Sequence, residues 1–356
     1  MLPGRTAGRL LAAIAAALLT ELLASCDSQP DHDLLALTGS TMGTTYSVQV
    51  VDPPPGTDLA GLRRRIDAAL ELVNDQMSTY RPESELSRFN AAATTDWTPV
   101  SAALATTVAA AKHIGAASGG ALDVTVGPLV NLWGFGPARS DDDVPAPEEI
   151  AAALARTGLD KLEVRLDPPA LRKTQPDVYV DLSSIAKGYG VDRVAAVLAA
   201  AGIDDLLVEI GGELYGRGLN ARGEPWRIAV ERPQSVGRRV LRVVPLRALG
   251  MATSGDYRNF FELDGVRYSH SIDPSTGWPV RHDLASVTVL ADNAMEADGW
   301  ATALLVLGPQ RGPALARSLN LAALFIERHP DDRLEVHTTA AFDRLTEAAP
   351  NDSVGS

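Results

Sequence analysis

The sequence predicts an α+β fold in which helices pack on a largely antiparallel sheet. Strand-like segments follow one another in the second half, as in Phe260–Ser269, where Asp264-Gly265 suits a tight hairpin turn. Ala322–Glu327 and Leu334–Thr338 form another such pair near the C-terminus. Helical segments lie between the strand pairs, and 46% hydrophobic with 22% charged residues is an ordinary globular composition. Sequential strand pairs mixed with helices favour an α+β domain.

The first half is expected to hold one strand and three helices. A tether over residues 26–37 precedes a strand over Thr41–Val51, which is rich in β-branched residues. Further helices are expected at Ala102–Ala117 and Glu148–Arg156. A helix from Leu59 is indicated by apolar residues at three- and four-residue intervals, namely Leu62, Ile66, Leu70 and Val73.

The second half alternates more regularly between strands and helices. Helices are expected at Ile185–Ala201 and Met295–Leu307, each stopped by a glycine. Besides the pairs above, the expected strands are Val178–Leu182, Leu206–Ile210, Trp226–Glu231, Arg238–Val244 and Ser286–Leu290. No internal repeat interrupts this order, so we expect one domain over residues 38–340 and a frayed tail over 341–356.

The N-terminus predicts export. Arg5 and Arg9 precede the apolar run Leu10–Leu23, and the segment Leu-Ala-Ser then leads to Cys26. This order is typical of a secretory signal over residues 1–25, and a Cys in that place resembles the lipobox of bacterial lipoproteins. The expectation is a chain lipidated at Cys26; an uncleaved anchor helix is the alternative, although the run is short for a membrane span.

Charge and cysteine content exclude several functions. The net charge is −13 without a long basic run, which argues against nucleic acid as a partner. Cys26 is the only cysteine, so the exported domain has no disulfide, no cysteine metal site and no thiol nucleophile. An anionic substrate would need a local device, such as a metal ion or a helix N-terminus.

The segment DLSSIAKGYGVD, Asp181–Asp192, offers such a device. A strand runs out at Asp181, Ser183 or Ser184 can cap the following helix, and Lys187 lies in its first turn. Two early glycines in this helix cost stability, so close packing or a ligand is a reason for them. A tightly packed strand–helix turn is the alternative interpretation.

The segment NAMEADGWATALLVLG, Asn293–Gly308, predicts a buried helix that carries Asp298 and Thr302 four residues apart. Both side chains therefore share one face of an otherwise apolar helix. A buried carboxylate is costly unless it is paired or bound to a metal, and hard oxygen ligands suit magnesium. The alternative is an aspartate paired with a neighbouring Arg or Lys.

A third segment, YSHSIDPSTGWPV over Tyr268–Val280, places His270 and Asp273 in a turn-rich loop. A structural hydrogen-bonding role for His270 is the alternative to a chemical one. No P-loop, no GxGxxG between strand and helix and no GxSxG occurs, and the GGEL at Gly211–Leu214 is interpreted as a turn. The residues alone therefore predict metal-assisted chemistry on a phosphate-containing substrate outside the cytoplasm.

Six blocks in this order closely resemble the ApbE family of flavin transferases, the FAD:protein FMN transferases. The likeness spans about residues 38–339, and it implies the family's α+β fold. The blocks are TMGTTY (41–46), STYRPESELSRFN (78–90), GGALDVTVGPLVNLWGFG (119–136), DLSSIAKGYGVD (181–192), ATSGDYRNFFELDGVRYSHSIDPSTGWPV (252–280) and EADGWATALLVLG (296–308).

The resemblance implies a magnesium-dependent enzyme that takes FAD as substrate, transfers FMN to a Thr or Ser hydroxyl of a target protein and releases AMP. It implies that Asp298 and Thr302 bind Mg²⁺ through side chains, and Ser184 and Ala301 through backbone carbonyls. His270 is expected near the reacting phosphate, as a catalytic residue with Asp298. The positions that match the family's flavin site are Met42, Tyr80, Ala121, Leu122, Asp123, Asp181, Lys187 and Ile272.

The resemblance also implies a place and partners. We expect a lipoprotein at the periplasmic face of the inner membrane that modifies subunits of the sodium-translocating NADH:quinone oxidoreductase or of Rnf-type complexes. Two alternatives stay open. Water in place of the acceptor hydroxyl gives an FAD pyrophosphatase that forms FMN and AMP, and a flavin-binding lipoprotein would need no metal ligands.

Overall fold

The computed structural model describes residues 32–137, 143–233, 239–255, 260–263, 265–329, 331 and 333–347. The expected signal segment over residues 1–25 and Cys26 lie outside the described residues. Within the described ranges, no helix is both long enough and apolar enough to cross a membrane.

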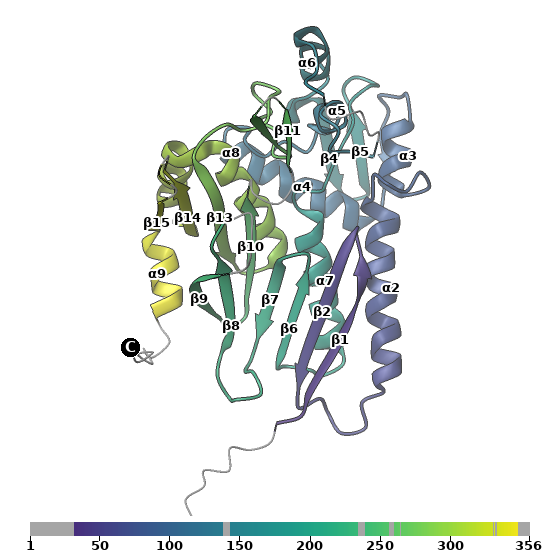
Figure 1. Ribbon diagram of the computed structural model, residues 1–356. Helices are drawn as coiled ribbons and strands as arrows, with labels where there is room; N and C mark the ends of the chain where they lie inside the picture. The colour runs from purple at the N-terminus through teal and green to yellow at the C-terminus, as the bar shows by residue number, and fades with distance from the viewer. Residues whose placement is uncertain are drawn as a thin grey trace, which may run out of the picture.

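An eight-stranded sheet forms the centre of the molecule and runs in Figure 1 from β1 on the right to β15 on the left. Every neighbouring pair in it is antiparallel. The predicted α+β class with a largely antiparallel sheet is therefore confirmed. In spatial order its strands are β1 (Leu34–Thr41), β2 (Thr44–Val51), β6 (Leu206–Ile210), β7 (Glu213–Arg217), β10 (Leu249–Gly255), β13 (Leu284–Ala291), β14 (Ala322–Arg328) and β15 (Leu334–Thr338).

Four helices pack on one face of this sheet: α2 (Leu59–Met77), α4 (Ala102–Ala117), α7 (Ala186–Ala200) and α8 (Ala294–Ser318). The apolar residues that predicted α2 are all buried, because their spacing places them on one side of the helix. One core cluster joins β2 and β6 to α2 and α7, and a second joins β10 and β13 to α4 and α8. The helices α7 and α8 lie side by side on the sheet. Together with the neighbouring strands they carry the residues of the site described below.

The opposite face of the sheet packs on a separate hairpin, β8 (Trp226–Glu231) with β9 (Val240–Leu246), and on α9 (Ala340–Glu347). Leu207 belongs to this cluster whereas Val208 belongs to the helical one, as the alternation of a strand requires. The remaining elements lie toward the upper end in Figure 1: α3 (Glu85–Ala91), β3 (Thr98–Pro99), α5 (Gly127–Leu132), α6 (Pro147–Leu154), the 3-10 turn Leu159–Lys161, β4 (Leu162–Leu166), β5 (Pro169–Lys173), β11 (Phe260–Leu263) and β12 (Val266–Ser269).

Both ends of the described chain are more ordered than expected. The strand predicted at Thr41–Val51 is the second half of a hairpin, and residues 34–37 of the expected tether pair with β2 as part of β1. This edge strand was missed because its side chains alternate between exposed and mostly half-buried positions and so lack a fully buried face. The frayed tail expected from residue 341 is wrong up to Glu347, because α9 buries Ala341 and Phe342 against the sheet.

One further expectation is wrong in detail. Residues 178–182 join no ladder, since the N–H and C=O of Val180 bond to the Asn90 side chain and Asp181 N donates to Val124 O. The stop expected at Gly308 is confirmed, because Gly308 has the non-helical backbone angles φ 76° and ψ −175° and α8 is kinked there. A second helical stretch follows this kink and ends at Ser318.

Candidate functional site

One cavity of about 900 Å³ is lined by residues of the strands β2, β6, β7, β8 and β10, by the start of α7, by the first half of α8 and by the loop after β12. The structure brings nearly all the predicted site residues to its wall, although they come from six separate segments. Those that line it are Met42, Tyr80, Ala121, Leu122, Asp123, Asp181, Ser184, Lys187, His270, Ile272, Asp298 and Thr302. Ala301 is buried in the core beside Asp298, and its predicted role concerns only its backbone carbonyl.

A buried ionic cluster occupies the floor of the cavity. Lys187 Nζ lies 2.6 Å from Glu213 Oε1 and 4.0 Å from Asp298 Oδ1. Asp298 is 2% exposed, and its Oδ2 accepts a 3.0 Å hydrogen bond from Gly188 N. Asp298 was interpreted either as the partner of a basic residue or as a metal ligand. The structure shows a long ion pair with Lys187, and Asp298 also lines the cavity, so both roles stay open to it.

Glu213 is the residue that the sequence did not indicate. The turn expected over Gly211–Leu214 is confirmed for Gly211 and Gly212 only, because Glu213 and Leu214 begin β7. Glu213 has an exposed fraction of 3%, and its Oε2 has no hydrogen-bond partner. A glutamate at the start of a strand, directly after two glycines, is the one sequence signal that points to it. The cluster holds two carboxylates against one ammonium, so it is short of positive charge.

The ionisation of this cluster reflects its burial. Burial raises the pKa of Glu213 to about 7 against the opposing attraction of Lys187. Burial likewise raises the pKa of Asp298, although Lys187 and the Gly188 N–H lower it. For Lys187 burial acts to lower the pKa, but attraction by Asp298 and Glu213 outweighs it and the pKa is raised. A bound cation would relieve this surplus of buried negative charge.

The two glycines in the first turns of α7 are explained by packing. A Cβ on Gly188 would lie 2.2 Å from Ala294 O of α8, and one on Gly190 would lie 2.8 Å from Met42 Cε. The predicted serine cap is wrong, because the N-cap is Ile185, and Ser183 instead donates its N–H and hydroxyl to Asp181 Oδ1. At the start of α7, the two glycines therefore permit close packing on α8 and Met42. Ser183 bonds to the buried carboxylate of Asp181 instead of capping the helix.

The N-terminus of α8 is held by α7. Asp192 accepts hydrogen bonds from Ala294 N and Met295 N at 2.8 and 2.9 Å, and Asn293 caps the same turn through Glu296 N. Burial raises the pKa of Asp192 to about 6, although these backbone donors lower it. The contacts fix α8 relative to α7, and with it the position of Asp298 against Lys187.

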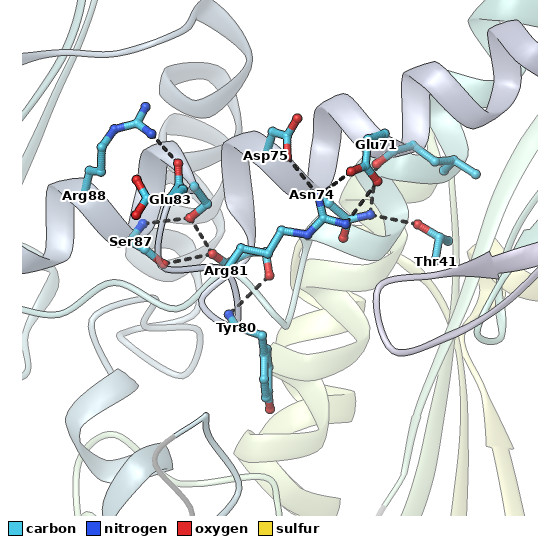
Figure 2. A network of polar contacts seen from close by, with 12 residues as sticks. Thr41, Glu71, Asn74, Asp75, Tyr80, Arg81, Glu83, Ser87 and Arg88 are labelled. Carbon is cyan, nitrogen blue, oxygen red and sulfur yellow. Dashed lines mark hydrogen bonds and ion pairs between the residues drawn. The ribbon is translucent and has the colours of Figure 1, made fainter.

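Tyr80 stands at the rim, and the polar network of Figure 2 supports it. Arg81 binds Glu71 and Asp75 of α2 at 2.6 and 2.8 Å, which anchors the segment to that helix. The Tyr80 ring points away from this network in Figure 2, is 64% exposed and donates its hydroxyl to Phe135 O at 3.3 Å. An exposed ring fixed at its base is suited to stack on a planar ligand.

The same network reaches the β1–β2 turn. Asn74 of α2 donates to Thr41 Oγ1 at 3.1 Å, next to Met42, whose φ is 49°. Met42 is thus held at a tight turn with its side chain against Gly190. A positive φ in a residue other than glycine is uncommon and often marks a functional position.

The loop after β12 forms another wall. Asp273 stabilises its turn by accepting from Ser275 N and Oγ at 2.8 and 2.7 Å, so this aspartate is structural. Ile272 pairs with Pro279 across the loop, and Trp133 Nε1 donates to Gly277 O at 2.8 Å. His270 lines the cavity with the edge of its ring toward Phe135, at 6.3 Å between ring centroids.

Asp123 and Asp181 also line the cavity. Asp123 is 8% exposed, and burial raises its pKa although Thr125 donates to it twice. Within the described part of the chain, no three His, Cys, Asp or Glu side chains gather as a metal-binding group. The candidate donors are instead Asp298, the Thr302 hydroxyl, which bonds to Ser254 Oγ at 3.2 Å, and backbone carbonyls.

Comparisons with known proteins agree with this geometry. The sequence profile of the ApbE family matches residues 42–325. The FAD:protein FMN transferase of Vibrio cholerae serotype O1 is 48% identical over 321 residues, which cover 90% of this chain and 95% of that protein. The FAD:protein FMN transferase of Haemophilus influenzae is 45% identical over 345 residues, 95% of this chain and 99% of that protein. The solved structure of the flavin transferase ApbE from Vibrio cholerae has a TM-score of 0.82 at 47% identity, covering 88% of this chain and 99% of that one.

Proposed function

The chain belongs to the ApbE family, and from this premise we propose that it transfers FMN from FAD to a Ser or Thr hydroxyl of an acceptor protein. The acceptor oxygen forms a bond to the phosphorus of the FMN half, the pyrophosphate P–O bond breaks, and AMP leaves. The proton of the hydroxyl passes to a base or to solvent. The observation that carries the proposal is the cavity that joins Lys187, Asp298, Thr302 and His270.

We propose Mg²⁺ as the cation of this site, which in phosphoryl transfer neutralises the charge of the phosphates. The donor set supports this, because hard oxygens from Asp298, Thr302 and the carbonyls of Ser184 and Ala301 are the ligands that magnesium takes. The excess of buried carboxylate over ammonium around Lys187 supports it independently.

The residues of the chain have distinct tasks in this scheme. Lys187 presents a permanent positive charge to the phosphates, and its attachment to Glu213 fixes where that charge lies. Tyr80 and Ile272 supply apolar and aromatic surface for the nucleotide, with Met42, Ala121, Leu122 and Asp123 along the same wall. His270 lies on the loop wall, where it is placed to orient or deprotonate the incoming hydroxyl.

The N-terminal sequence supports a location. A signal segment that ends at Cys26 and a single cysteine in the whole chain favour an exported lipoprotein at the periplasmic face of the inner membrane. Acceptors in that compartment are the flavin-carrying subunits of sodium-translocating NADH:quinone oxidoreductase or Rnf-type complexes.

The test is a labelling reaction with the purified chain, FAD, Mg²⁺ and such an acceptor subunit. The proposal predicts a fluorescent acceptor band on a denaturing gel and an equal amount of AMP. Free FMN and AMP without a labelled band would instead identify a pyrophosphatase, and neither product would leave a flavin-binding protein.

A further inference from the structure

The strand β8 meets the cavity along its edge. Five consecutive residues, Arg227 to Glu231, line the cavity that also holds Asp298 and Lys187. Side chains of a strand alternate between two faces, so a cavity that lies on a face contacts every second residue. The strand β6 behaves in that way, since Leu207 and Glu209 line the cavity and Val208 does not. A run of five shows that the backbone edge of β8 forms the wall.

At Arg227 and Ala229 this edge is not paired with another strand of the described chain. The sheet of β8 contains β9 alone, and the two are antiparallel. Arg227 lies opposite Pro245, which has no N–H, and Arg232 N donates to Arg239 O at 2.8 Å at the other end of the ladder. Both facts show that the even-numbered residues of β8 form the main-chain hydrogen bonds to β9. The N–H and C=O groups of Arg227 and Ala229 are therefore directed away from β9, toward the cavity.

The same cavity is lined by this edge and by the ionic cluster. Its floor passes from Glu209 through Gly211 and Gly212 to Glu213, next to Lys187. A Cβ added to Gly212 would meet no atom within 4 Å, so the floor is open at that point. Ala229, in the middle of the edge, is exposed and small, which permits close approach of another backbone.

We propose that the edge of β8 binds the acceptor polypeptide as an added strand and so presents its hydroxyl to the phosphates. This inference rests on the proposed function, because that reaction brings a polypeptide into the cavity that β8 lines. Strand addition takes its affinity from main-chain hydrogen bonds. It therefore accepts varied side chains, provided that the segment is extended and carries the hydroxyl at the correct register.

The experiment compares Ala229→Pro with Val243→Pro in the full chain. Val243 lies directly opposite Ala229 in the ladder, is 41% exposed and does not line the cavity. By the same alternation, each proline removes an N–H that points away from the partner strand, so both variants keep the β8–β9 ladder. The N–H lost in Ala229→Pro faces the cavity, whereas the one lost in Val243→Pro faces away from it.

The probe is the acceptor subunit of a sodium-translocating NADH:quinone oxidoreductase, and the rate of its FMN labelling gives KM for the acceptor. Loss of one main-chain hydrogen bond predicts a KM raised about fivefold in Ala229→Pro. The affinity for FAD, measured by flavin fluorescence, stays at the wild-type value, and Val243→Pro matches the wild type in both quantities.

Three results would overturn the inference: an unchanged KM in folded Ala229→Pro, an equal rise in both variants, or a loss of FAD affinity in Ala229→Pro. Wild-type dimers in sedimentation that Ala229→Pro abolishes would assign the edge to a second copy of the chain and would overturn it too. A wild-type chain that labels no acceptor would instead refute the proposed transferase activity, and the acceptor strand with it.

Discussion

Replacing Asp298 by asparagine separates the catalytic role of this residue from its structural role. The side chain keeps its size, and its oxygen still accepts from Gly188 N, which lies 3.0 Å from the carboxylate. What is lost is one negative charge, which lies 4.0 Å from Lys187 Nζ. If Asp298 is the charged ligand of a cation at the phosphates, Asp298→Asn is expected to lose activity while the chain stays folded.

The two effects differ in size. A charge-assisted hydrogen bond contributes about 1 kcal/mol more than a neutral one, so the variant loses about that amount at Gly188. The loss is offset in part, because burial raises the pKa of Asp298 and so disfavours its charged form in the folded protein. We expect Tm to change by at most about 4 °C. Loss of a preorganised charge at a reacting centre costs about 100- to 1,000-fold in turnover.

The assay measures three quantities in parallel: Tm, FAD binding without magnesium, and AMP release against magnesium concentration. Glu296→Gln is the matched control, because Glu296 is an exposed acid in the first turn of the same helix. Asp298→Asn should bind FAD without magnesium at least as tightly as the wild type, since a negative charge near the pyrophosphate is gone. Unaltered magnesium-dependent turnover in Asp298→Asn would refute the assignment of Asp298 as a metal ligand.

Three further predictions concern other groups. In Glu213→Gln, Lys187 loses its partner at 2.6 Å, Glu213 Oε1, and becomes free to approach the buried carboxylate of Asp298. We therefore expect the apparent affinity for magnesium to fall about tenfold. An unchanged magnesium titration would contradict this. Asp192 has a pKa of about 6 against 3.8 for an ordinary aspartate, so as pH rises through this window the unfolded state loses its proton first, and folding stability falls by about 3 kcal/mol. Asp192→Asn should remove that fall. Urea unfolding at pH 4 and at pH 7 gives the change in the free energy of unfolding between the two pH values for the variant and for the wild type. An equal change in both proteins would show that Asp192 does not cause it. Cys26→Ser should abolish the incorporation of labelled fatty acid into the chain, and a labelled Cys26→Ser chain would contradict lipidation at Cys26.

Much of the fold was predictable because burial and periodicity agree along the chain. The residues Leu62, Ile66 and Leu70 repeat at helical spacing and are fully buried in α2. The terminal pair β14–β15 was predicted as a hairpin of Ala322–Glu327 with Leu334–Thr338. In these elements local preference and tertiary packing point to the same structure.

The errors lie where tertiary contacts decide. The edge strand β1 exposes every second side chain and only half-buries most of the others, so its sequence lacks a fully buried stripe. Residues 178–182 read as a strand, but the side chain of Asn90, distant in sequence, takes the backbone bonds of Val180. The helix α9 is short and held by Phe342, whose burial depends on the far face of the sheet.

The residues of the site were found segment by segment, and their shared chemistry together with the resemblance to the ApbE family joined them into one predicted site. Asp298 and Thr302 were found because an oxygen pair at helical spacing in an apolar helix is unusual. The spacing of residues along the sequence does not indicate which strand residue faces Lys187 of α7. Glu213 was therefore predicted only as part of a turn. The edge of β8 was missed for a related reason, since an unpaired strand edge is a property of sheet topology and not of the residues in it.

The most direct measurement of the central claim is labelling of the acceptor subunit by the full chain with FAD, with and without Mg²⁺. The account predicts a covalent flavin band that needs magnesium, is lost when the acceptor hydroxyl is removed, and appears with one AMP per FMN transferred. AMP release that continues at the same rate without any labelled acceptor would contradict it.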